Sequence, residues 1–210
     1  MMPLMQNKRA VTGMETLWQN DALKVVRYEG VIEVLGQGTV VGNQTVMNSR
    51  IGVARTYDYI RLLEDDGTVR TLPHMTVYNG VDSYLSPQLR AKIYTLEPFD
   101  KNEKSTIVAL DMGERRLIDV DDLMASIDAA DKLLDKMLPG SYVGILLGAI
   151  GSLVVLGIPV LIASIVAVKK LRKAKKKIAE FPAADTIRQI IEASMQGHQR
   201  GKELKQAALV

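Results

Sequence analysis

The chain has 210 residues, a formal net charge of +3 and no cysteine. The absence of cysteine excludes a disulfide framework and thiolate metal sites. The charge is unevenly divided: residues 1–139 hold 16 basic and 20 acidic residues, whereas residues 140–210 hold 11 and 4. Because phosphate contacts need a basic surface, the acidic balance of the first part disfavours nucleic-acid binding.

The first part of the chain predicts a tail and then a small β-domain. Residues 1–22 lack the apolar core of a signal peptide, and we expect an N-terminal tail there. Residues 23–120 are rich in Val, Ile, Thr and Tyr, with glycine-bearing turns at short intervals, which is typical of strands. Asp66 and Gly67 predict one tight hairpin turn, and Gly113 a second. The pattern predicts a small antiparallel β-barrel or sandwich.

The spacing of apolar residues changes in residues 121–138, and the new spacing predicts a short amphipathic stalk helix. Its apolar residues recur at spacings of three and four, which is a heptad seam. They are Leu123, Ile127, Ala130, Leu134 and Met137. Such a helix packs either on its own β-domain or on a second copy of itself, and the sequence leaves both possibilities open.

Residues 139–168 predict one transmembrane helix. The chain carries no charge over residues 137–168, a length beyond the roughly 20 residues that a helix needs to cross a bilayer. Gly157 and Pro159 predict a kink in this helix. Small residues recur at every fourth position and favour close helix–helix packing in lipid; they are Gly140, Gly144, Gly148 and Ser152.

Residues 169–210 predict a basic block followed by a helical tail. The block consists of Lys169, Lys170, Arg172, Lys173, Lys175, Lys176 and Lys177. We expect it to bind anionic lipid headgroups, although a solvated charge run that only fixes topology is the alternative. After the interruption at Phe181 and Pro182, the apolar residues of one helical face, Ile187 and Ile191 among them, predict a helix that docks a partner or the bilayer. A weakly ordered tail is the other interpretation.

The basic residues also predict the topology. Seven of them follow the predicted span within 14 residues, whereas Lys132 and Lys136 alone precede it within an equal window. This bias places the C-terminal tail in the cytoplasm, at a bacterial inner (plasma) membrane. The favoured arrangement puts the β-domain outside. A re-entrant hairpin with its tip at residues 157–159, and an inside β-domain with a translocated basic tail, remain open.

The sequence offers no residues for catalysis. His74 and His198 lie in different regions, and neither has a neighbour that would orient a general base. The cluster of Asp119, Asp121 and Asp122 lacks the glycine and the distal glutamate of a calcium loop. We therefore expect no enzymatic activity, no cofactor and no metal site.

Together these patterns predict a non-enzymatic, single-pass, membrane-anchored interaction or scaffold protein. It would form a homo-oligomer through its glycine-bearing span, while its β-domain recognises a protein partner. Two other classes remain open. One is a pore-forming or membrane-perturbing protein of a toxin-like or lysis-related kind. The other is an accessory subunit of an envelope-spanning secretion, conjugation or transport machine.

Overall fold

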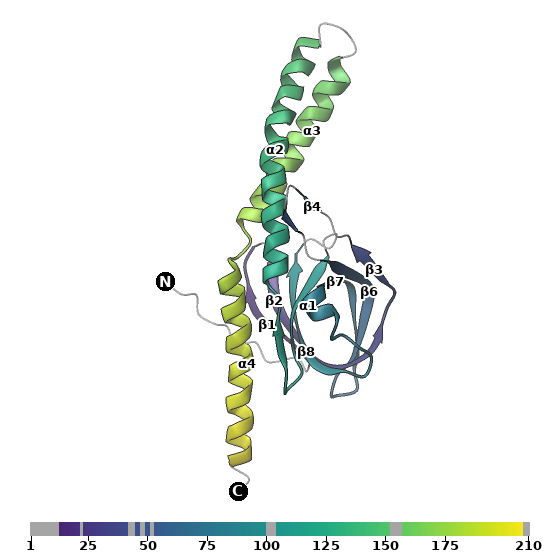
Figure 1. Ribbon diagram of the computed structural model, residues 1–210, viewed down its shortest axis with the longest axis vertical. Coiled ribbons are helices and arrows are strands. Elements are labelled where there is room, and N and C mark those ends of the chain that lie inside the picture. Colours follow the sequence, from purple (N-terminus) through teal and green to yellow (C-terminus); the bar gives the residue numbers. More distant parts are fainter. Residues whose placement is uncertain are drawn as a thin grey trace. The chain divides into compact units, whose positions relative to one another are not determined.

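The computed structural model describes residues 13–21, 23–41, 45–46, 49–50, 53–99, 104–151 and 157–207. These residues fold into two compact units (Figure 1). The first unit combines most of the strands with the C-terminal helix, and the second contains two long helices.

The strands of the first unit form one sheet that closes into a barrel. Its order is β1-β2-β8-β9-β7-β6-β3, with β10 beside β9, and an additional pairing of β2 with β6 closes it. The bounds are β1 Met14–Gln19, β2 Leu23–Leu35, β3 Gly38–Val41, β6 Ala54–Leu63, β7 Val69–Tyr78, β8 Arg90–Pro98, β9 Ser105–Asp111 and β10 Arg116–Ile118. A short helix, α1 (Asn79–Asp82), follows β7.

The prediction of a small β-barrel is confirmed, with one correction. Both predicted hairpin turns are present, and Gly67 and Gly113 take the positive φ values of 82° and 87° that favour glycine. The Asp66 side chain accepts a hydrogen bond from the Thr68 N–H at 2.8 Å and holds the first turn. However, β7 and β9 are parallel, so the sheet is not purely antiparallel.

The barrel closes at a glycine because the backbones approach closely there. Gly30 lies where β2 leaves its pairing with β1 and begins its pairing with β6. A Cβ atom at Gly30 would lie 2.6 Å from the carbonyl oxygen of Leu63, too close for a side chain. Inside the closed barrel the core is formed by alternate residues of the strands; its members include Tyr28, Ile32, Ile60, Leu62, Leu72, Met75, Val77, Ile93, Ile107 and Leu110.

Helix α4 (Ala184–Ala207) belongs to the same unit as the barrel, although it follows the second unit in sequence. Ile187, Ile191 and Met195 recur every four residues and are buried. The Arg27 guanidinium on β2 donates a hydrogen bond to the Ser194 hydroxyl at 3.4 Å. The apolar stripe of α4 therefore packs on the barrel's outer wall, instead of docking a partner or forming a loose tail.

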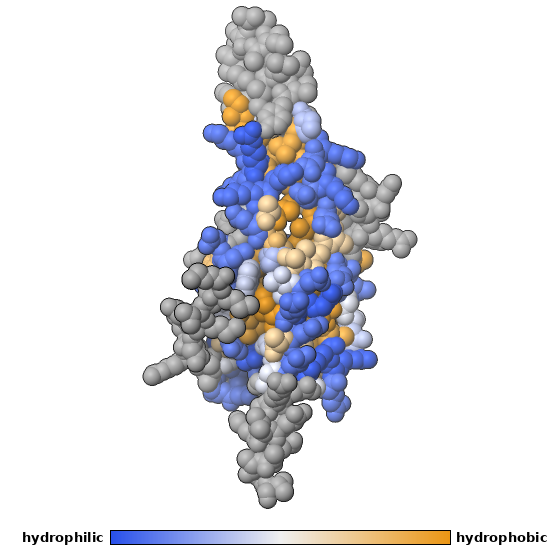
Figure 2. Space-filling model, turned by 90° about the vertical axis from the view of Figure 1, so that its left-hand side faces the viewer, coloured by the Kyte–Doolittle hydropathy of each residue, from blue (hydrophilic) through white to orange (hydrophobic). Residues whose placement is uncertain are grey.

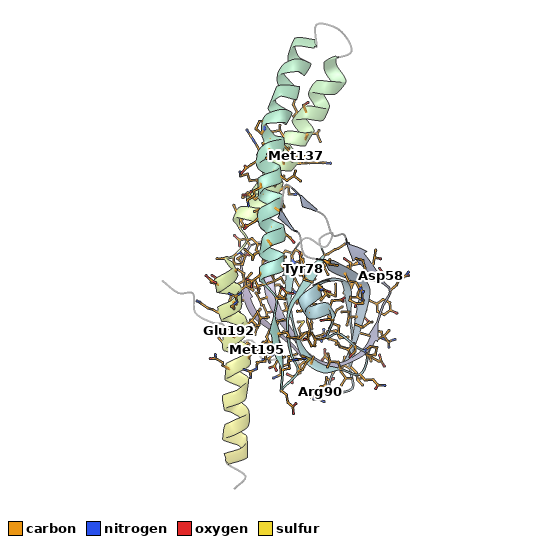
Figure 3. All side chains as sticks on the ribbon, in the orientation of Figure 1. Asp58, Tyr78, Arg90, Met137, Glu192 and Met195 are labelled. Atoms are coloured by element: carbon orange, nitrogen blue, oxygen red, sulfur yellow. The ribbon has the colours of Figure 1, made fainter. Side chains whose placement is uncertain are left out.

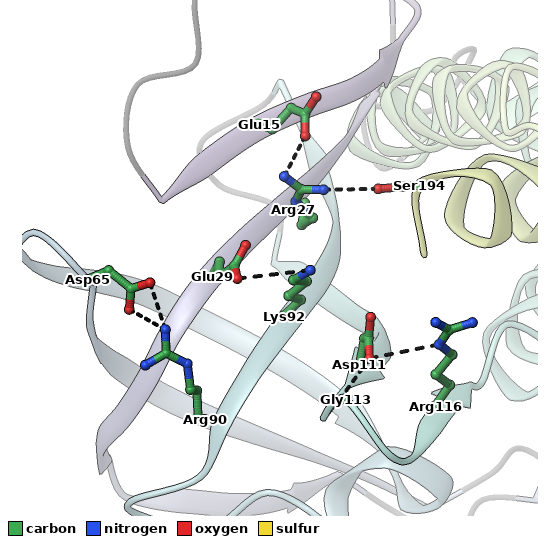
Figure 4. A network of polar contacts seen from close by, with 10 residues as sticks. All are labelled: Glu15, Arg27, Glu29, Asp65, Arg90, Lys92, Asp111, Gly113, Arg116 and Ser194. Carbon is green, nitrogen blue, oxygen red and sulfur yellow. Dashed lines mark hydrogen bonds and ion pairs between the residues drawn. The ribbon is translucent and has the colours of Figure 1, made fainter. Parts of the chain in front are cut away.

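Oppositely charged side chains cross the barrel wall beside α4 (Figure 4). Arg27 forms an ion pair with Glu15 across β2 and β1 at 2.8 Å. In the neighbouring row, Glu29, Lys92, Asp111 and Arg116 stand opposite one another on β2, β8, β9 and β10. Opposite charges at such cross-strand positions favour this register over a slipped one.

The second unit contains two antiparallel helices that lie side by side, α2 (Asp121–Gly151) and α3 (Gly157–Ala179) (Figure 1). It also contains the short strands β4 (Thr45–Val46) and β5 (Ser49–Arg50). The prediction of one transmembrane helix over residues 139–168 is therefore wrong. Among the helices that the structure describes, none combines the length and the apolar character needed to cross a membrane.

The apolar run is interrupted because it is shared between two helices. The predicted stalk continues through Pro139, so residues 121–138 are only the first part of α2. Gly157 is the first residue of α3, and Pro159 lies in its first turn. The predicted kink at Gly157 and Pro159 stays a prediction, because the residues that precede Gly157 lie outside the described part of the chain.

The packing of α4 predicts different effects for two adjacent isoleucines. Ile191→Ala should lower the free energy of unfolding of the barrel by about 2–5 kcal/mol, because it leaves a cavity beneath α4. Ile190→Ala removes the same atoms from a half-buried position and should cost about 1 kcal/mol or less. Urea unfolding followed by the fluorescence of Trp18, the one tryptophan of the chain, on β1, measures both. Equal effects would mean that the stripe is not packed as described.

Candidate functional site

One ion pair joins the two helices of the hairpin and indicates their register. Lys175 on α3 contacts Asp135 on α2. The hydrogen bond with Asp135 raises the pKa of Lys175 above its ordinary value, so the lysine is charged at neutral pH. Because the helices run antiparallel with equal rise, Lys169 on α3 lies about level with Ser141 on α2.

Beyond the level of Lys169, neither arm of the hairpin carries a charge. These charge-free segments are residues 142–151 of α2 and 157–168 of α3. At 1.5 Å per residue they extend roughly 15 and 18 Å. The hydrocarbon core of a bilayer is about 30 Å thick. Each arm therefore has about the length needed to enter one leaflet.

Basic side chains cover the exposed side of α3 where the charge-free segment ends. Lys169, Lys170, Lys173 and Lys176 are exposed. The half-buried residues of the same stretch, Leu171, Ala174, Lys175 and Ile178, recur at helical spacing on the side where Lys175 meets α2. The exposed lysines consequently point away from α2 and form what we call the basic belt.

Apolar side chains are exposed beside the basic belt. Ile165 and Val166 on α3 and Met137 on α2 are each at least two-fifths exposed. Figure 3 labels Met137. Figure 2 shows hydrophobic side chains between the grey tip and a band of hydrophilic ones. An apolar segment bordered by cationic side chains is typical of proteins that enter the interface of an anionic bilayer.

The residues predicted for helix packing are only partly described. Gly140, Gly144 and Gly148 lie on the helical backbone of α2, and Ser152 lies outside the described residues. Of the predicted seam, Leu123 is buried, Ile127 and Leu134 are half-buried, and Ala130 and Met137 are exposed. In the basic block, the side chain of Lys177 lies outside the description, and Lys176 pairs with Glu180 at 3.6 Å.

Sequence reasoning missed the pairing of the two helices. Asp131 and Asp135 recur four residues apart on α2, and both carboxylates contribute to the raised pKa of Lys175. An acidic row on one helix and a basic row on the next indicate an antiparallel pair. That signal is present in the sequence, but the prediction of a stalk helix rests on its apolar seam alone and does not use it.

The described residues offer no arrangement for metal chemistry. No three His, Cys, Asp or Glu side chains among them gather closely enough to hold a metal ion. His74 is exposed on β7 and has a φ of 49°. Asp119 lies beside α1, where a Cβ atom on Gly80 would meet its carboxylate at 2.3 Å. This close approach gives Asp119 a packing role at α1.

Comparison with known proteins adds no function. No protein-family model matches the chain, and the search finds no significant similarity to a curated protein or to a solved structure.

The hairpin tip predicts a local response to lipid. Since the chain has no cysteine, Ile165→Cys can be labelled at one site with an environment-sensitive fluorophore. Adding vesicles that contain anionic phospholipid should shift its emission to the blue, because the label enters hydrocarbon. The same label at Asp58→Cys, on an exposed position of the barrel (Figure 3), should not shift. An unchanged emission at Ile165, or equal shifts at both sites, would contradict the assignment.

Proposed function

We propose that this chain is a non-enzymatic, membrane-anchored interaction protein. Its α2–α3 hairpin inserts the charge-free tip into one leaflet, and the basic belt binds anionic lipid headgroups. The barrel remains in the aqueous phase as the part that recognises a protein partner. The proposal replaces the single-pass anchor that the sequence alone favoured.

The packing of α4 on the barrel carries this proposal. The barrel precedes the hairpin in sequence and α4 follows it, yet both belong to one folded unit. A helix that crossed the membrane between them would place these parts on opposite sides. The buried Ile187 and Ile191, together with the contact of Arg27 with Ser194, support a hairpin that enters and leaves on the same side.

The re-entrant topology is thereby favoured over the two crossing ones. Both ends of the hairpin then lie on the side of the basic belt. Basic residues next to membrane segments are retained in the cytoplasm. We therefore propose that the barrel and α4 lie together at the cytoplasmic face of a bacterial inner membrane.

Electrostatic attraction supplies the first part of the binding energy. Each basic side chain near an anionic surface contributes about 1 kcal/mol. Four exposed lysines therefore hold the hairpin at the surface by roughly 4 kcal/mol, before any apolar burial. Insertion of the tip then adds a hydrophobic contribution that is independent of salt.

Two lysines test the belt by vesicle binding. Lys169→Gln with Lys173→Gln should weaken binding to anionic vesicles about 30-fold, since two basic contacts are lost. The matched control is Arg90→Gln with Lys104→Gln, two exposed basic residues of the barrel unit. It should change the affinity less than about 2-fold. An equal loss in both variants, or tight binding of wild type to neutral vesicles, would argue against the belt.

Self-association through the glycine-bearing face of α2 stays a prediction. In mild detergent, Gly144→Ile with Gly148→Ile should reduce the oligomer to monomers, because bulky side chains prevent close helix approach. Leu146→Ile with Leu147→Ile, on the same helix, should leave it intact. A monomeric wild type, or full assembly of the glycine variant, would remove helix packing from the proposal.

A further inference from the structure

We propose that the outer wall formed by β2, β6 and β7 binds the same wall of a second copy of this chain about a two-fold axis. We call this surface the β6 face. It is defined by Tyr59, Arg61 and Leu63 on β6, Val69 on β7 and Glu33 on β2. The proposal goes beyond membrane anchoring and does not depend on it.

The β6 face combines exposed apolar residues with an exposed ion pair between them. Leu63 stands opposite Val69 on one neighbouring strand and opposite Val31 on the other. Tyr59, Leu63 and Val69 are 38%, 38% and 45% exposed. Their inward-pointing neighbours Ile60 and Leu62 belong to the core. The exposed residues therefore project outward, although the water-facing side of a sheet is normally polar.

On the other side of the same barrel, an outward-pointing apolar residue is buried beside a helix. On β2, the core residue Val26 points inward and its neighbour Val25 points outward, yet Val25 is fully buried. That region of the wall lies beside α4, which contacts Arg27 through Ser194. In Figure 1, α4 lies at the left of the barrel and β6 at the right. None of the described elements gives the β6 face a comparable cover, and exposed apolar surfaces of this kind mark binding sites.

Charge complementarity selects a second copy as the occupant. Arg61 and Glu33 lie 3.1 Å apart, and each side chain is 42% exposed. A two-fold axis through this pair places Arg61 of each copy against the Glu33 carboxylate of the other copy. The surface is therefore complementary to itself. The apolar residues on either side then exclude water from the charged centre, which strengthens the pairs.

Charge-swapped copies of the full chain test this arrangement directly. In mild detergent, R61E alone and E33R alone should each associate at least 10-fold more weakly than wild type, because like charges meet across the axis. An equimolar mixture should recover to within about 3-fold of wild type, since every contact across the axis is again between opposite charges. Energy transfer between donor-labelled and acceptor-labelled copies measures all three affinities. A mixture no stronger than either variant alone would overturn the proposal.

A matched pair of single variants separates this face from general stickiness and from hairpin packing. Val69→Lys should abolish the association, whereas Phe99→Lys, at an apolar residue 51% exposed after β8, should leave it unchanged. Equal effects of the two variants would overturn the proposal. So would a monomeric wild type, or association that responds only to Gly144→Ile with Gly148→Ile. Failure on these points leaves vesicle binding by the basic belt intact as a separate result.

Discussion

The burial of one stripe of α4 against the barrel is the interaction on which the rest of the structure depends. Ile187, Ile191 and Met195 lie more than 150 residues after β2 in sequence, yet they belong to the same folded unit. Full burial of such side chains contributes about 1.5–3 kcal/mol each, as an upper bound. The chain between the barrel and α4 must therefore leave the unit and return to it. A hairpin of two helices satisfies that constraint, and a single long helix does not.

The contact beneath α4 is only partly apolar. Burial raises the pKa of Tyr94 on β8, and the neighbouring Ser194 and Arg27 oppose the rise. The tyrosine therefore stays neutral at physiological pH, and Arg27 remains paired with Glu15. On the same barrel wall, ion pairs join Lys92 to Glu29 and Arg116 to Asp111 across neighbouring strands (Figure 4). Apolar burial thus supplies the attraction, while the polar contacts specify where the helix lies.

Local chemistry in the sequence predicted the local structure well. Gly67 and Gly113 indicated hairpin turns because few other residues adopt positive φ readily, and the abundance of Val, Ile, Thr and Tyr between such turns indicated the barrel. The apolar face of α4 was also visible, but not its partner, because the contact of Arg27 with Ser194 joins residues 167 positions apart. The parallel pairing of β7 with β9 was not predicted for a similar reason, since the spacing of residues along a strand does not specify which strand lies beside it.

The membrane segment was misinterpreted for a related reason. A count of charge-free residues measures how much chain is apolar, but not where its helix ends. Pro139 lies inside α2, whereas Gly157 begins α3. Which of these residues marks a helix end follows from the packing of α4 on the barrel, and the local sequence does not reveal it. Lys169, Lys170 and Lys173 of the basic block are exposed, and the binding of lipid headgroups by this block stays a prediction. The pairing of Lys175 with Asp135 was not predicted, because it depends on the hairpin.

Native-state hydrogen exchange of the full chain, resolved by peptide mass spectrometry, tests the central claim most directly. If α4 and the barrel form one unit, the amides of residues 187–195 should exchange with an opening free energy close to that of β2 and β8. Protected barrel strands beside α4 amides that exchange at the rate of an unfolded peptide would contradict the account. The hairpin would then no longer be required to return to the side from which it came.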